Sequence, residues 1–71
     1  MNNNGRTVLF ISAMNDGVVE FQVNMTRYVY RVPPPYVKRI VRLANKSEWK
    51  ALNLVKKRGS LINKYEVELD E

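Results

Sequence analysis

The side chains most able to do chemistry in this sequence are basic. Of its 71 residues, 12 are Lys or Arg and 7 are Asp or Glu, which gives a formal net charge of +5. Lys and Arg at helical spacing or in short clusters can position the phosphates of a nucleic acid with little readout of its sequence. We therefore predict phosphate contacts, to RNA or DNA, for two groups of residues. On two expected helices they are Arg39, Arg42, Lys46, Lys56, Lys57 and Arg58, and beside an expected tyrosine strand they are Arg27 and Arg31.

Aromatic residues lie close to these cations in the sequence. Tyr28, Tyr30 and Tyr36 could offer stacking faces to unpaired bases, because every base has a flat ring that packs on an aromatic side chain. Tyrosines at alternate positions of a strand belong more often to a hydrophobic core. Both interpretations remain open for these residues.

The acidic side chains are concentrated at the C-terminal end. Residues 1–64 hold 12 basic and 3 acidic side chains, whereas the last six residues hold the other four acids, Glu66, Glu68, Asp70 and Glu71. A basic body of this kind attracts polyanions. The alternative interpretation is that the lysines and arginines keep a small protein soluble, and that its partner is another protein or a second copy of this chain.

Enzymatic chemistry is not expected. The sequence has no His and no Cys, which excludes an imidazole base, a thiol nucleophile and a Cys/His zinc site. Glu66, Glu68 and Asp70 could share one strand face and hold a hard cation, but a solvated acidic face explains them better. The remaining acids suit a turn, an exposed strand face and a helix start, namely Asp16, Glu20 and Glu48. We predict no catalytic residue, no metal site and no cofactor.

Length and composition describe one small domain. The sequence is 45% hydrophobic and lacks cysteine, so its stability must come from an apolar core, and a reducing cytoplasm is the expected location. The apolar run Val8–Ile11 is far shorter than the roughly 20 residues that cross a bilayer, so no membrane contact is expected. We expect a polar leader at 1–6, the domain at 7–69 and an acidic end at 70–71.

Three strands are expected first. Residues 7–14, 18–24 and 27–32 are rich in β-branched and aromatic residues, and the last two segments alternate between apolar and polar residues. We expect Ser12 to share a face with Val8 and Phe10. Asn15-Asp16-Gly17 predicts the first hairpin turn, and the second reversal is expected at Met25-Thr26.

Two helices and a last strand are expected next. Val37, Ile40, Val41 and Ala44 recur at helical spacing, and Ser47 begins a second amphipathic helix that ends at Gly59. Pro33 to Pro35 are interpreted as a stiff corner rather than as an exposed docking peptide. Alternation between Tyr65 and Asp70 predicts the last strand. The expected fold is α+β, a three-stranded antiparallel meander with a possible fourth C-terminal strand, covered by one or two short helices.

Residues 18–59 resemble the KTSC domain, a family named for the C-terminal domain of some lysyl-tRNA synthetases. The segments that carry the resemblance are "VVEFQVN", "YVYRVPPPYV" and "KSEWKALNLVKKRGS". Residues at comparable positions are Tyr28, Tyr30, Val32, Pro33, Leu52, Asn53 and Lys56, while Trp49 stands where the family usually has Gly. The resemblance implies a small non-enzymatic α+β accessory domain, with nucleic-acid contact as an expectation by association.

The sequence thus predicts a non-enzymatic binding or accessory module that contacts nucleic-acid phosphates through a basic helical face. The alternative is a protein-interaction or regulatory module that can form a homodimer and has no role in nucleic-acid binding.

Overall fold

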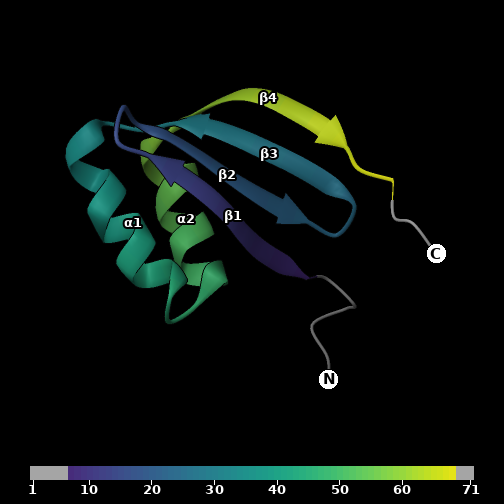
Figure 1. Cartoon of the computed structure of the whole chain (residues 1–71), viewed down its shortest axis with the longest axis horizontal. Helices are drawn as coiled ribbons and strands as arrows, with labels where there is room; N and C mark the ends of the chain where they lie inside the picture. Colours follow the sequence, from purple (N-terminus) through teal and green to yellow (C-terminus); the bar gives the residue numbers. More distant parts are fainter. Residues whose placement is uncertain (1–6, 69–71) are drawn as a thin grey trace.

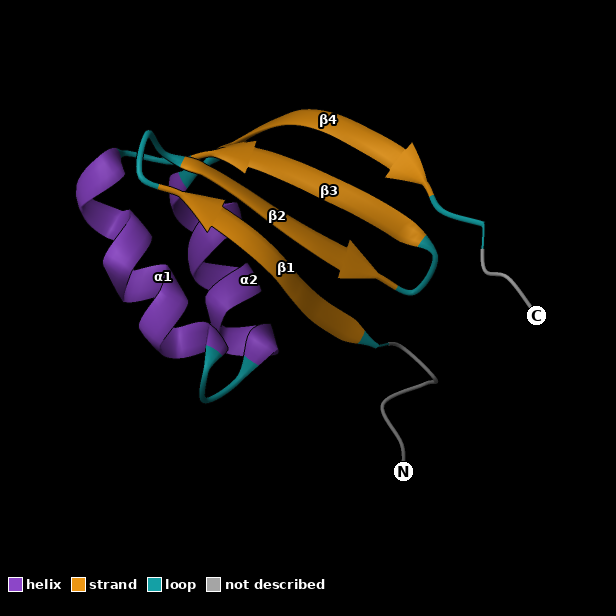
Figure 2. Cartoon of the chain, in the orientation of Figure 1, coloured by secondary structure: helices purple, strands orange, loops and turns teal. Residues whose placement is uncertain are grey.

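The computed structural model describes residues 7–68, which form one antiparallel sheet with its helices on one face (Figures 1 and 2). The strand order β1-β2-β3-β4 follows the chain, so each strand pairs with its sequence neighbour, and the α+β prediction is confirmed. The strands are β1 (Val8–Met14), β2 (Val18–Val23), β3 (Thr26–Arg31) and β4 (Ser60–Glu66). The helices are the 3₁₀ turn η1 (Pro34–Tyr36), α1 (Val37–Ala44) and α2 (Glu48–Arg58).

Two tight turns join the first three strands. In the first, Gly17 has a φ of 100° and its backbone N–H donates to the Met14 carbonyl at 2.9 Å. In the second, Asn24 has a φ of 54°, and its side-chain oxygen accepts from the Thr7 N–H at 3.0 Å. This reversal is centred on Asn24 and Met25, one residue before the predicted position, because Asn tolerates a positive φ that Met and Thr disfavour.

A β-bulge at Ile11 changes which side chains of β1 face the helices. Val8 and Phe10 pair with the buried residues Val23 and Phe21, but the register shifts before Ser12. Ser12 therefore points to the opposite face, where its hydroxyl hydrogen-bonds to the Glu20 carboxylate at 3.4 Å. The prediction that Ser12 shares a face with Phe10 was wrong, because one extra residue in a strand reverses the alternation beyond it.

The core lies between the helices and the first three strands. Val19, Phe21, Ile40 and Val55 are the largest fully buried side chains, and Phe10 meets Phe21 edge to face with ring centroids 5.3 Å apart. Three of the four apolar residues predicted for the first helix are buried, whereas Val41 is 36% exposed at the edge of the stripe. The buried helical residues are Val37, Ile40 and Ala44 of α1 and Ala51, Leu52 and Val55 of α2.

The proline-rich segment makes the corner between β3 and α1. Pro34 to Tyr36 form the turn η1, and the Tyr36 N–H donates to the Pro33 carbonyl at 2.9 Å. The Tyr36 ring is half-buried against the core. Pro33 to Pro35 are exposed, but a docking peptide of this kind binds in an extended conformation, whereas this segment is folded into a turn. The conformation therefore agrees with the interpretation as a corner.

The last strand starts earlier than predicted. It begins at Ser60, directly after Gly59, and ends at Glu66, whereas the sequence pattern placed it between Tyr65 and Asp70. Residues 69–71, which include the end of that predicted strand, lie outside the described residues. β4 lies beyond the helix layer, and all of its residues are exposed (Figure 1). A strand without a buried face has no reason to alternate between apolar and polar residues, which explains the error.

Candidate nucleic-acid interface

Helix α1 turns its apolar side to the sheet and its basic side to solvent. Val37, Ile40 and Ala44 are buried, and between them the helix is exposed at Lys38, Arg39 and Arg42. Lys46 is exposed in the turn that follows. The spacing that buries one face of a short helix necessarily places the residues between its members on the outer face. The predicted residues Arg39 and Arg42 therefore lie on the outer face of α1, and Lys46 is exposed just beyond the end of this helix.

Helix α2 continues this surface. Ser47 caps its N-terminus by accepting from the Lys50 N–H at 3.3 Å, as predicted, and Glu48 lies in the first turn. Lys50 and Lys57 are both exposed and seven residues apart, which places them on the same side of the helix. We use the term outer basic surface for the exposed cations on the solvent side of the two helices. They are Lys38, Arg39, Arg42, Lys46, Lys50 and Lys57.

Residues 34–58, which contain both helices, carry eight basic side chains and one acidic side chain, Glu48. The other acids that the structure describes lie elsewhere. Asp16 is in the first turn, Glu20 is on β2, and Glu66 and Glu68 are at the end of β4 and just after it. The helices thus carry a concentrated positive charge with little local compensation, which is the arrangement that attracts polyanions.

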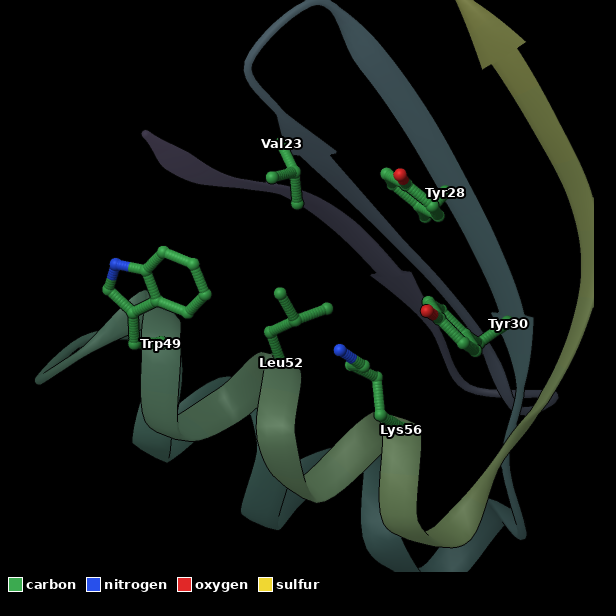
Figure 3. Close-up of a pocket in the computed structure, with 6 residues that line it drawn as sticks. All are labelled: Val23, Tyr28, Tyr30, Trp49, Leu52 and Lys56. Carbon is green, nitrogen blue, oxygen red and sulfur yellow. The ribbon is translucent and has the colours of Figure 1, made fainter. Parts of the chain in front are cut away.

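The three basic residues in the last turn of α2, Lys56, Lys57 and Arg58, point in different directions. Lys57 belongs to the outer basic surface, while Arg58 lies over the ring of Tyr36 with 5.3 Å between its guanidinium carbon and the ring centroid. Lys56 points to the sheet side of α2 (Figure 3). The cation–π contact with Tyr36 occupies the face of the Arg58 guanidinium and leaves N–H groups at its edge, so this group can also meet a phosphate.

The two predicted cations of β3 are not brought together with those of the helices. Arg27 and Arg31 alternate with Tyr28 and Tyr30, which face α2, and so they lie on the opposite face of the sheet. Arg27 is paired there with the Glu20 carboxylate at 3.6 Å. These two arginines therefore lie on the face of the sheet that points away from the helices, and they are not part of the outer basic surface.

A small pocket opens between α2 and the sheet (Figure 3). Its volume is about 90 Å³. The rings of Tyr28 and Tyr30 are close to parallel, at 17° and with centroids 6.5 Å apart, and they form one wall. Trp49, Leu52 and Lys56 recur on one side of α2 and form the facing wall, and Val23 of β2 completes the lining.

Burial changes the acidity of one group in this pocket. It raises the pKa of the Tyr30 phenol above its ordinary value of 10.0, and the neighbouring Tyr28 adds to the rise. The folded protein therefore favours the neutral phenol. The stability gained from this preference is present below pH 10 and is lost as the pH rises through the folded-state pKa.

This predicts an alkaline loss of stability that depends on Tyr30. Between about pH 8 and pH 11, the free energy of unfolding should fall less in Tyr30→Phe than in the unmodified protein, because phenylalanine cannot ionise. Urea titrations at the two pH values measure this difference. Tyr65→Phe is the matched control, because Tyr65 is 49% exposed and lies outside the pocket, and this variant should follow the unmodified protein. Equal losses in all three proteins would contradict the prediction.

Two further features were sought among the described residues, a cluster of metal ligands and a membrane-spanning helix. Within residues 7–68, no group of three or more acidic side chains is placed to hold a metal ion. Asp70, the third member of the acidic set named from the sequence, lies outside this range. No helix in the same range is long and apolar enough to cross a membrane.

No protein-family model, curated protein or solved structure matched the chain. The resemblance to the KTSC domain stays a prediction from the sequence segments that carry it.

Sequence reasoning missed three residues of this region. Lys50 could have been found from its seven-residue spacing to Lys57. Trp49 packs partly against the core and also lines the pocket, a position that its helical spacing alone does not reveal. Lys64 pairs with Tyr28 across β3 and β4 and lies on the same face of the sheet, beside the pocket. No sequence signal pointed to Lys64, because its position depends on the register of a strand that was predicted too late.

Proposed function

We propose that this chain is a non-enzymatic nucleic-acid-binding module that holds phosphates on the outer basic surface. The observation that carries the proposal is the charge of the two helices, with eight basic side chains against one acid in residues 34–58 and with the basic groups exposed. Phosphate contacts of this kind position a nucleic acid without reading its sequence. RNA and DNA are both expected to bind, in the cytoplasm, and the resemblance to a domain fused to some lysyl-tRNA synthetases favours the same class of ligand.

The spacing of the cations supports the proposal further. Arg39 and Arg42 are one turn apart on α1, and Lys46 follows one turn later, so the three charges form a row along the helix pair. Lys50 and Lys57 form a second row on α2, which packs beside α1 (Figure 1). Cations on two adjacent helices can neutralise several phosphates of one strand, and each phosphate contact adds to the affinity and to its salt dependence.

Binding of a labelled oligonucleotide at several salt concentrations tests the proposal. The logarithm of the association constant should fall linearly with the logarithm of salt concentration, with a slope of about −0.7 to −0.9 for each phosphate contacted. Five contacts would give a slope of roughly −3.5 to −4.5. Fluorescence anisotropy measures the constants. Absence of binding at about 20 mM salt, where counterion release is most favourable, would rule the proposal out.

One observation favours the alternative, binding to a protein or to a second copy of this chain. β4 is an edge strand, all of its residues are exposed, and Leu61, Ile62 and Tyr65 are large hydrophobic residues with exposed fractions of 50%, 44% and 49%. Exposed edge strands can pair with a strand of another chain. Sedimentation of the protein alone, over the concentrations used for the binding assay, separates self-association from nucleic-acid binding.

A further inference from the structure

The pocket between α2 and β3 differs in chemistry from the rest of the helix side. Its walls are aromatic, with Tyr28 and Tyr30 on the sheet and Trp49 on α2 (Figure 3). Flat aromatic side chains that remain accessible are the usual platforms for unpaired bases, since stacking is available to every base. Tyr28 and Trp49 are each half-buried and both line the pocket.

The size of the pocket limits what can enter. Its volume of about 90 Å³ is well below the roughly 300–1,000 Å³ of pockets that enclose a cofactor or a drug-sized ligand. It is also smaller than the cavity of roughly 150 Å³ that encloses benzene in an engineered protein. One flat ring can enter it in part, with the rest of the ligand outside. A volume of this size is too small to enclose a cofactor, but it can receive the edge of a base that belongs to a nucleic-acid strand.

Positive charge lies on both sides of the pocket. Lys56 lines it from α2, one residue before Lys57 of the outer basic surface, so pocket and surface meet at the end of this helix. Lys64 flanks it from β4, opposite Tyr28 and on the same face of the sheet. Glu66 is also on this face, opposite Thr26, and repels phosphate at the far end of β4. A strand that enters the pocket should therefore leave its phosphates near Lys56 and Lys64.

The polar groups of the pocket are suited to a base edge. The Tyr28 and Tyr30 side chains lie on the side of the sheet that faces α2, and both line the pocket with their phenol groups (Figure 3). A tyrosine hydroxyl both donates and accepts hydrogen bonds, and so can meet the mixed donors and acceptors of an unpaired base.

We propose that this pocket binds one unpaired base of a single-stranded nucleic acid, with the base between the tyrosine wall and Trp49 and the neighbouring phosphates on Lys56 and Lys64. The inference rests on the proposed function and adds to it a preference for single strands. A paired base cannot enter, because its edge is hydrogen-bonded to the base of the partner strand and its faces are stacked on neighbouring bases.

Fluorescence of the protein itself tests the proposal. Trp49 is the one tryptophan in the sequence, so its emission reports directly on the pocket. Three probes of the same length are titrated at low salt: oligothymidylate, an abasic oligonucleotide with the same phosphates, and a duplex. We expect oligothymidylate to quench Trp49, and the other two to bind by anisotropy without quenching. Equal affinity and equal emission with oligothymidylate and the abasic strand would overturn the base pocket while leaving phosphate binding intact. No binding of any probe would instead remove the proposed function.

A pair of tyrosine variants locates the effect. Tyr28→Leu removes an aromatic wall and keeps an apolar side chain, and it should weaken binding of oligothymidylate by roughly 5- to 100-fold, the loss of one stacked base, with no change for the abasic strand. Tyr65→Leu is the matched control, because Tyr65 pairs with Arg27 on the other face of the sheet. Circular dichroism confirms that both variants fold. Equal binding by the two variants would overturn the proposal.

The same pocket could instead receive a side chain from a second copy. Trp49 emission would then change with protein concentration in the absence of nucleic acid, and oligothymidylate would not quench it. That pair of results would also overturn the proposal, whereas emission that is independent of protein concentration supports it.

Discussion

Replacing Gly17 with alanine is expected to remove most of the stability of this domain. Gly17 has a φ of 100°, a region that costs an L-residue about 1–2 kcal/mol. A Cβ at this position would also overlap the carbonyl oxygen of Val32, which is backbone and cannot rotate away. The Gly17 carbonyl in turn accepts from the Val32 N–H at 2.7 Å, so moving either strand apart breaks a hydrogen bond.

The expected loss is large in relation to what the core can supply. Three effects contribute to the expected loss of folding free energy: the strained backbone, overpacking of about 1–3 kcal/mol, and a lost hydrogen bond of about 1 kcal/mol. Because relieving one of them partly relieves the others, we expect a total loss of about 3 kcal/mol. A single core in a chain of this size supplies roughly 3–5 kcal/mol of net stability. Urea unfolding followed by Trp49 emission and circular dichroism measures the free energy of unfolding.

The neighbouring residue provides the control. Asp16 is exposed in the same turn and has no positive φ, so Asp16→Ala should change the free energy of unfolding by no more than about 0.5–1 kcal/mol. If Gly17→Ala cost as little as Asp16→Ala, the tight contact between the first turn and Val32 would not exist in solution.

The elements that could be predicted from sequence are those with one buried face. β2 alternates because Val19, Phe21 and Val23 are buried on the side of the helices, and α1 repeats at helical spacing because Ile40 and Ala44 are buried against the sheet. The period of the hydrophobic pattern is a direct consequence of one-sided burial. The same reasoning identified Arg39 and Arg42 as exposed, since residues between the members of an apolar stripe must face outward.

The elements that could not be predicted are those in which the sequence pattern is not determined by burial of one face. β4 has no buried residue, so its true start at Ser60 left no trace in the sequence, and the alternation further along was misleading. The bulge at Ile11 depends on how two strands pair rather than on either strand alone. The pocket could not be predicted either, because Trp49 and Tyr28 come to line the same pocket only when α2 covers this face of the sheet.

Removing two arginines from α1 should weaken nucleic-acid binding much more than removing two arginines from β3. In Arg39→Gln/Arg42→Gln, the slope of log association constant against log salt should become less steep by about 1.4–1.8, because each lost phosphate contact accounts for about 0.7–0.9. The same counterion release implies a loss of about tenfold in affinity for each contact at roughly 50 mM salt. Both residues are exposed and neither belongs to the core, so the variant should stay folded.

Arg27→Gln/Arg31→Gln is the matched control, because it removes the same charge from the opposite face of the sheet. Arg27 is already paired with Glu20 at 3.6 Å, and neither arginine lies on the outer basic surface. The control should therefore keep the salt dependence of the unmodified protein, apart from a small uniform loss due to the lower net charge. Equal weakening by the two double variants would mean that the protein attracts polyanions through its net charge alone. Selective weakening by the α1 variant would mean that the helix pair is the surface on which the phosphates lie.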